Sequence, residues 1–177
     1  STSASRRFEI TYPAADLVTG AADVLLAALD EAYGKIEALG LSWANRTSWP
    51  VRATIETFEG AEAQRVAHEI PSRFGDNSWQ VSFNERFLQD ASQTELWKIT
   101  AGHELFHLMQ RLYDPRNRIS KARNENDWFW YKEALSTWFE RRKASDSSYI
   151  PSTVRYVPGS NNSSDNYAFL RSHGLEY

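Results

Sequence analysis

Two histidines four residues apart, with a glutamate directly after the first, are the side chains of this chain best suited to chemistry. They form the motif His-Glu-Leu-Phe-His at residues 103–107. On a helix this spacing places both imidazoles on one face, with the carboxylate beside them. Two neutral imidazoles in that arrangement are typical zinc ligands, and the adjacent glutamate can act on a water at the metal. The motif therefore predicts metal-assisted hydrolysis, with zinc held by His103 and His107 and with Glu104 as the base.

The motif lies in a stretch, residues 96–113, that has the apolar pattern of a mostly buried helix. Ser92-Gln93-Thr94-Glu95 precedes it and has the form of a capping box, which predicts the N-terminus of the helix. Polar side chains inside an apolar helix are costly unless partners or a metal satisfy them. We interpret the motif as a zinc site, and a hydrogen-bonded structural cluster is the alternative.

A third protein ligand must come from another segment, because the second histidine is not followed by the Gly and His of the metzincin pattern. An aromatic-rich stretch, residues 128–140, is predicted to form a second helix with Glu133 at its centre. Glu140 is seven residues further on and so points the same way, although it also begins a charged run typical of a solvated face. Glu125 and Asp127 belong to the preceding polar segment, where a ligand would be held less rigidly.

The two helical stretches together resemble the gluzincin metallopeptidases, the group of thermolysin and the aminopeptidase N-like enzymes. The resemblance covers His-Glu-x-x-His at residues 103–107 and Glu-Ala-x-x-x-Trp-x-Glu at residues 133–140. It implies His103, His107 and Glu133 as the ligands of one catalytic zinc ion and Glu104 as the general base. It also suggests that Glu140 holds a zinc-binding histidine in the correct tautomer.

The resemblance implies an α+β, zincin-like fold. This would be a small mixed sheet with an edge strand over the cleft, packed on a buried motif helix and a second ligand-bearing helix. The chain departs from both named branches, since Thr137 replaces thermolysin's aspartate and the aminopeptidase Gly-x-Met-Glu-Asn motif is absent. We therefore expect a divergent gluzincin that acts as an endopeptidase on peptide or protein substrates. A zinc hydrolase of a non-peptide amide and a zinc-stabilised binding module without turnover are the alternatives.

The other elements are predicted from apolar periodicity and turn residues. Strands are expected at residues 7–12, 51–58, 66–70 and 79–83. A helix is expected at residues 14–39, with Gly40 as its C-terminal stop. Residues 79–83 most closely precede the motif helix and are our candidate for the edge strand that pairs with substrate, with an ordinary core strand as the alternative. His68 lacks a second histidine nearby and is predicted to be structural.

Composition indicates one domain, residues 1–177, since 41% of the residues are apolar and 14% are aromatic. We expect a sheet-containing upper part at residues 1–91, the zinc-site helices at 92–140 and a loop-rich tail at 141–177. The net charge of −3 is no nucleic-acid signature. No apolar run approaches the roughly 20 residues of a membrane span. The lack of cysteine excludes disulfides, thiolate ligands and thiol catalysis.

The tail and the chain ends bear on mechanism and compartment. Metallopeptidase sites usually add a tyrosine or histidine that stabilises the oxyanion, and the candidates are Tyr167, His173 and Tyr177. The chain begins in a small polar stretch, residues 1–5, and stops where related enzymes continue with another helix. We expect a mature secreted form or part of a longer protein, located outside the cytoplasm, with a cytoplasmic location as the alternative.

Overall fold

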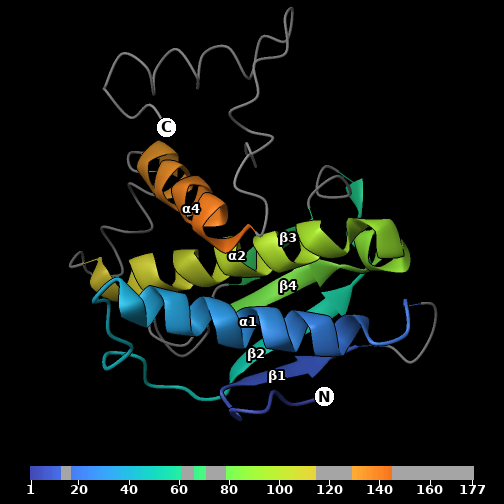
Figure 1. The fold of residues 1–177 in the computed structure, drawn as a ribbon, viewed down its shortest axis with the longest axis horizontal. Coiled ribbons are helices and arrows are strands. Elements are labelled where there is room, and N and C mark those ends of the chain that lie inside the picture. The colour runs from blue at the N-terminus through green and yellow to red at the C-terminus, as the bar shows by residue number, and fades with distance from the viewer. Residues whose placement is uncertain (13–16, 61–65, 71–78, 115–128, 145–177) are drawn as a thin grey trace, which may run out of the picture.

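The computed structural model describes residues 1–12, 17–60, 66–70, 79–114 and 129–144. These residues form a mixed α+β arrangement of one four-stranded sheet and three α-helices (Figure 1). Helices α1 and α2 run side by side in the same direction across one face of the sheet, and α4 crosses α2 on the side away from α1. The α-helices are α1 (Ala21–Ala38), α2 (Thr94–Tyr113) and α4 (Phe129–Lys143).

The sheet has the strand order β1-β2-β4-β3. Its members are β1 (Phe8–Thr11), β2 (Val51–Glu56), β3 (Ala67–Ile70) and β4 (Gln80–Asn84). The first three strands in this order are parallel, and α1 provides the crossover between β1 and β2 that a parallel pair requires. Strand β3 pairs antiparallel with β4, with Ala67 opposite Phe83. All four predicted strands are therefore confirmed as strands.

The prediction that residues 79–83 form the edge strand is wrong. Strand β4 pairs with β2 on one side and with β3 on the other, so β3 occupies the edge. Residues Val81, Ser82, Phe83 and Asn84 of β4 are all buried, as expected for an interior strand. Chain order misled the prediction, because the antiparallel pairing of β3 with β4 places the earlier strand on the outside.

The N-terminal half of the first helix is shorter than predicted. Residues 17–20 are not helical, and α1 begins only after Gly20, which has a φ of +83°. That left-handed conformation is open to glycine at little cost and interrupts the helical path. The C-terminal end agrees with the prediction, since Leu39 caps α1 and Gly40 follows it with a φ of +84°. Residues 14–16 lie outside the described part of the chain.

The capping box predicted at the start of α2 does not form. Two short 3₁₀ turns precede the helix, η3 (Glu85–Gln89) and η4 (Ala91–Gln93). The side chain of Asp90 accepts a hydrogen bond from the Ser92 backbone N–H at 2.9 Å, and no side chain caps α2 itself. Asp90 thus satisfies the Ser92 N–H that Glu95 would have bonded in the capping box.

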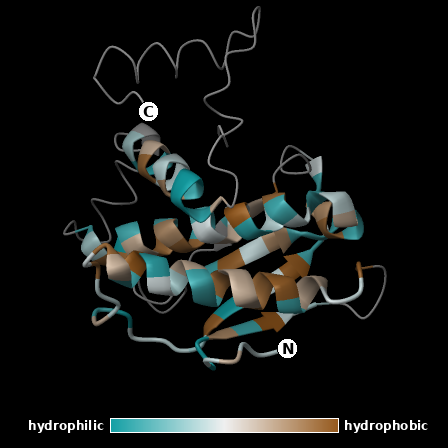
Figure 2. Ribbon diagram, viewed as in Figure 1, coloured by the Kyte–Doolittle hydropathy of each residue, from teal (hydrophilic) through white to brown (hydrophobic). Residues whose placement is uncertain are grey.

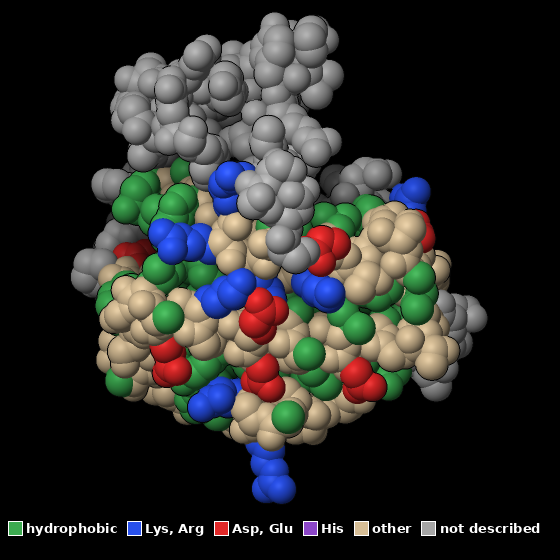
Figure 3. All heavy atoms as spheres, viewed as in Figure 1, with side chains coloured by type: hydrophobic (Ala, Val, Ile, Leu, Met, Phe, Trp, Pro, Cys, Tyr) green, Lys and Arg blue, Asp and Glu red, His purple; other side chains and the backbone are tan. Residues whose placement is uncertain are grey.

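The core lies between the sheet and the pair α1 and α2, and it extends into the contact between α2 and α4. In Figure 2 hydrophobic residues are frequent along the strands and occur at intervals along the helices. Figure 3 shows acidic and basic side chains interspersed on the outer face, over α1. Within the described residues no helix has the length and apolar character needed to cross a membrane. The largest fully buried side chains include Trp97, Phe8, Phe83, Phe139, Leu25, Leu29, Leu105 and Met109.

Close packing fastens the C-terminal half of α4 to its neighbours. A Cβ atom at Gly102 would lie 3.1 Å from the Lys143 side chain and 3.4 Å from Phe139, so a glycine lets α4 approach α2. The rings of Phe106 and Phe139 stack with their centroids 4.8 Å apart. Lys143 forms a salt bridge with Glu31 of α1. These contacts hold the C-terminal half of α4, which carries Glu140, against α2 and α1.

Replacement of Phe139 by alanine is expected to destabilise the fold by about 3–5 kcal/mol, because it removes a fully buried ring and leaves a cavity between α2 and α4. Urea denaturation measures the change in the free energy of unfolding. The control is Leu39→Ala, since Leu39 is 37% exposed and should cost far less. Equal losses in both variants would contradict the packing described for α4.

Candidate metal centre

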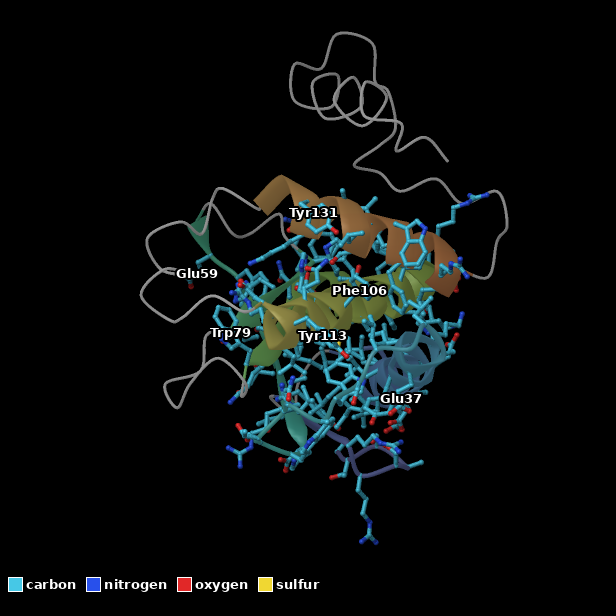
Figure 4. The ribbon with its side chains drawn as sticks, turned by 90° about the vertical axis from the view of Figure 1, so that its left-hand side faces the viewer. Glu37, Glu59, Trp79, Phe106, Tyr113 and Tyr131 are labelled. Carbon is cyan, nitrogen blue, oxygen red and sulfur yellow. The ribbon has the colours of Figure 1, made fainter. Side chains whose placement is uncertain are left out.

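Both motif histidines lie where α4 crosses α2, and they face one carboxylate from α4. Figure 4 shows this crossing, with Phe106 on α2 and Tyr131 on α4. The Nε2 atoms of His103 and His107 are 3.0 Å apart. An oxygen of Glu133 lies 3.4 Å from His103 Nε2, and its other oxygen lies 3.1 Å from His107 Nε2. In the described part of the chain these three side chains form a group that could hold a metal ion.

The far side of each imidazole ring meets a hydrogen-bond acceptor. Glu140 Oε1 lies 2.6 Å from His103 Nδ1, so the carboxylate accepts a hydrogen bond from the Nδ1–H group. Gln110 Oε1 lies 2.9 Å from His107 Nδ1, and the amide is held in that orientation because its Nε2 donates to the Lys132 carbonyl. Both rings are therefore set with Nδ1 protonated, which leaves each Nε2 atom to face Glu133.

A buried cluster of two imidazole nitrogens and a carboxylate is stable only if a positive charge is present among them. Two Nε2 lone pairs and a carboxylate converge in a largely buried place, where unpaired acceptors repel one another. Without a metal, burial lowers the pKa of His103, but hydrogen bonds to Glu133 and Glu140 outweigh burial and raise this pKa to about 10. Burial raises the pKa of Glu133, yet its contacts with the two histidines bring that pKa well below its usual range. In the metal-free protein a proton therefore supplies the charge that a metal would otherwise bring.

The metal-free protein is expected to lose stability as the pH rises from about 6.5 towards 10. The folded state holds the His103 proton with a pKa of about 10, against an ordinary value of 6.5. This stabilisation is complete below pH 6.5 and is lost as the pH rises through the folded pKa. Urea midpoints of chelator-treated protein between pH 6 and pH 9 test this. His103→Gln should flatten the profile, and an equally steep profile in that variant would contradict the assignment.

Glu104 is buried, with 7% of its surface exposed, and it has interaction partners within the fold. On an α-helix it lies about 60° around the axis from His107 and about 100° from His103. The carboxylate therefore lies on the flank next to the candidate ligands and does not belong to the group that converges between the helices.

Two residues that sequence reasoning missed complete the surroundings of His107. Gln110 is its hydrogen-bond partner on the same helix, and Ser136 Oγ lies 3.1 Å from the same Nδ1 atom. Helical spacing was the available signal, since Gln110 is three residues after His107 and Ser136 is three residues after Glu133. Both side chains therefore face the crossing of α2 and α4.

The other predicted site residues are placed as follows. Glu140 is not solvated, because only 13% of its side chain is exposed and it bonds to His103. His68 lies on β3 with its ring stacked 4.6 Å from Phe58, apart from the histidine pair. The weaker ligand candidates and the oxyanion candidates lie outside the described residues: Glu125, Asp127, Tyr167, His173 and Tyr177.

Replacement of Glu140 by glutamine is expected to weaken metal binding by about 10-fold to 100-fold, with zinc as the probe. The amide keeps the shape of Glu140 but offers His103 Nδ1 a weaker, uncharged acceptor. Competition with a chromogenic chelator measures the affinity. Glu95→Gln is the matched control on α2, where a half-exposed carboxylate pairs with Lys98. Equal affinities of the two variants would show that the Glu140 contact does not matter for metal binding.

Comparisons with known proteins found no match, so the function has to be inferred from the geometry of the site. No protein-family model matches the chain, and neither the curated proteins nor the solved structures contain a match. The resemblance to gluzincins therefore rests on the motif residues of α2 and α4. What the chain does has to be argued from the donor atoms, their spacing and the residue beside them.

Proposed function

We propose that this chain is a zinc-dependent metallopeptidase that hydrolyses internal peptide bonds of peptide or protein substrates. The observation that carries the proposal is the convergence of His103, His107 and Glu133 on one point, with Glu104 directly beside the first histidine. Catalytic zinc sites have three protein ligands and an open position, whereas structural sites have four ligands and no use for a base. A zincin-like class for the α+β fold is part of the same proposal.

The spacing of the three groups suits zinc. Ligands of a tetrahedral zinc ion lie about 2.0–2.2 Å from the metal, which puts them about 3.4 Å from one another. The contacts among the two Nε2 atoms and the Glu133 oxygens measure 3.0, 3.1 and 3.4 Å. Two imidazole nitrogens and one carboxylate are also a donor set found in catalytic zinc sites. The residues present therefore fit one zinc ion with three protein ligands.

In the proposed reaction Glu104 would transfer the proton, and Glu140 and Gln110 would orient the two histidines. Zinc at this site would act as a Lewis acid and would lower the pKa of a water molecule towards about 7. Glu104 accepts a proton from the water as the water oxygen attacks the scissile carbonyl carbon. It then donates that proton to the amine nitrogen as the C–N bond breaks. Glu140 and Gln110 retain the Nδ1 protons of His103 and His107, so that both Nε2 atoms keep their lone pairs for the metal.

Strand β3 is the proposed binding strand for substrate. It is paired with β4 along one side, and within the described residues no strand pairs with its other side. An edge strand presents backbone N–H and C=O groups to which an extended peptide can bind. Because β3 also packs near α2, a peptide bound there would pass along the helix that carries Glu104. The strand proposed to pair with substrate is therefore β3, and not residues 79–83.

The proposal is tested by incubating the zinc-loaded protein with a diverse peptide mixture and identifying the products by mass spectrometry. We expect internal cuts that a chelator prevents and that added zinc restores. If one zinc ion is bound and no peptide is cut, the peptidase proposal fails. A zinc-stabilised binding protein, or a hydrolase of another amide, would then account better for the site.

A further inference from the structure

The last residue of α4 is a lysine whose side chain is buried. Only 1% of the Lys143 side chain is exposed, and its Nζ atom forms a salt bridge with Glu31 of α1. The contact reaches across α2, because α4 crosses α2 on the side away from α1 (Figure 1). Gly102 of α2 makes room for it, since the Lys143 Cγ atom lies 3.1 Å from the place that a Cβ atom of residue 102 would take. Lys143 therefore links all three helices.

A second lysine adds to the link between α1 and α4. Lys35 lies one turn after Glu31 on α1 and forms a salt bridge with it at 3.0 Å. Its Nζ atom also donates a hydrogen bond to the Arg142 carbonyl oxygen at 2.8 Å. That carbonyl belongs to the last turn of α4, where carbonyl groups have no partner within the helix. Glu31, Lys35 and Lys143 are called the α1–α4 ion-pair cluster below.

The ion pair of Lys143 contributes more to position than to stability. Burial lowers the pKa of Lys143, and its contact with Glu31 opposes that effect by favouring the charged form. Apolar side chains of similar size often stabilise a protein as well as a buried ion pair does, because desolvation of the charges offsets their attraction. An ion pair, however, is favourable only in a narrow range of geometries, whereas the hydrophobic effect is non-directional. Lys143 is thus suited to hold α4 in one placement.

The side chains of α4 that face the metal centre lie between two attachments of this helix. At the N-terminal end the Lys132 carbonyl oxygen accepts a hydrogen bond from Gln110 of α2 at 2.9 Å. At the C-terminal end Lys143 is held by the α1–α4 ion-pair cluster. Glu133 and Glu140 lie between these points, and Glu140 is only one turn before Lys143. Metal ligands have to be held within about 0.5 Å of their productive positions, so the placement of α4 decides the quality of the site.

We propose that Lys143 is a positioning residue for the metal centre. Its ion pair with Glu31 sets the placement of α4, and that placement sets where Glu133 and Glu140 lie relative to the two histidines of α2. The inference rests on the proposed function, because it requires the site to bind zinc. Lys143 acts through the helix backbone, at a distance from the reacting atoms.

The test compares zinc affinity with stability in the same variants. Lys143→Met keeps an unbranched side chain of similar length beside Gly102 but removes the charge. We expect zinc binding about tenfold weaker than in the parent by chelator competition, as for other residues that orient a ligand. The urea midpoint of the metal-free variant should stay close to that of the parent. Ile10→Val, which removes a buried methyl group on β1, should lower the urea midpoint without weakening zinc binding.

A double-mutant cycle connects the effect to the ion pair. Glu31→Gln should also weaken zinc binding. The double variant with Lys143→Met should bind zinc no more weakly than Lys143→Met alone, because both changes remove the same interaction. Asp23→Asn, at an exposed residue of α1, removes the same charge as Glu31→Gln and should bind zinc like the parent. Parental zinc affinity in Lys143→Met, or additive losses in the double variant, overturns the inference.

Hydrolysis of peptides by the parent protein is measured separately, so that the two proposals can fail independently. If the parent binds zinc and cuts peptides while Lys143→Met keeps the parental affinity, only the positioning role fails. If the parent binds zinc without cutting any peptide and Lys143→Met binds zinc more weakly, the positioning role stands and the peptidase proposal fails. A parent protein that binds no zinc contradicts both.

Discussion

Replacement of Glu104 by glutamine is expected to lower the rate of peptide hydrolysis by about 100-fold to 10,000-fold while one zinc ion remains bound. Glutamine has nearly the same volume, so the packing around this buried side chain is retained. The amide cannot accept the proton that the attacking water must lose. Rates are measured on a peptide identified by the mixture experiment, with the zinc content of each preparation determined by elemental analysis.

The matched control is Glu95→Gln, in the first turn of the same helix, where the carboxylate is half-exposed and paired with Lys98. It removes the same charge but lies more than two turns from Glu104, so the rate should not change. A Glu104→Gln variant that hydrolyses peptide at the parental rate would show that another group is the base. If zinc were lost along with the activity, Glu104 would have a role in binding the metal, and its assignment as the general base would need revision.

Replacement of Glu133 by alanine is expected to weaken zinc binding by more than about 100-fold, which exceeds the loss expected for a residue that only orients a ligand. The variant keeps both histidines but loses the carboxylate whose two oxygens face their Nε2 atoms. Chelator competition measures the affinity. Thermal denaturation with and without added zinc gives an independent readout, since a metal that binds only the folded state raises the melting temperature.

Glu133→Gln separates charge from shape in this experiment. It preserves the size of the side chain and one oxygen donor, so we expect zinc affinity between those of the parent and of Glu133→Ala. The control is Glu9→Gln, at a half-exposed glutamate of β1, and this variant should bind zinc like the parent. Parental affinity in Glu133→Ala would mean that the third ligand comes from a different side chain, and Glu140 would be the first to examine because it already contacts His103.

Much of the local structure was predictable from the order of the residues. The apolar period of residues 96–113 indicated α2, and the alternation of residues 7–12 indicated β1, because these patterns follow directly from helix and strand geometry. The same reasoning failed at Gly20, where a single left-handed residue delays the start of α1 beyond the predicted residue 14. It also failed at the start of α2, where Asp90 and a 3₁₀ turn replaced the expected capping box.

Strand position could not be predicted in this way. Residues 79–83 and 66–70 were both recognised as strands, but which of them lay at the edge depended on pairing between segments distant in the chain. Strand order is decided by such non-local contacts, whereas periodicity reports only on the residues within one strand. The consequence for function is large, because the proposed substrate strand changed from β4 to β3.

The sequence by itself determined that His103 and His107 share one face of a helix and that Glu133 and Glu140 share one side of another. Only the tertiary structure decided that these two sides meet, with Gly102 admitting α4 and with Gln110 and Ser136 turned towards His107. The physical reason is that the spacing within a helix is set by its own backbone hydrogen bonds. The distance between two helices is instead set by the packing of side chains that lie far apart in the chain.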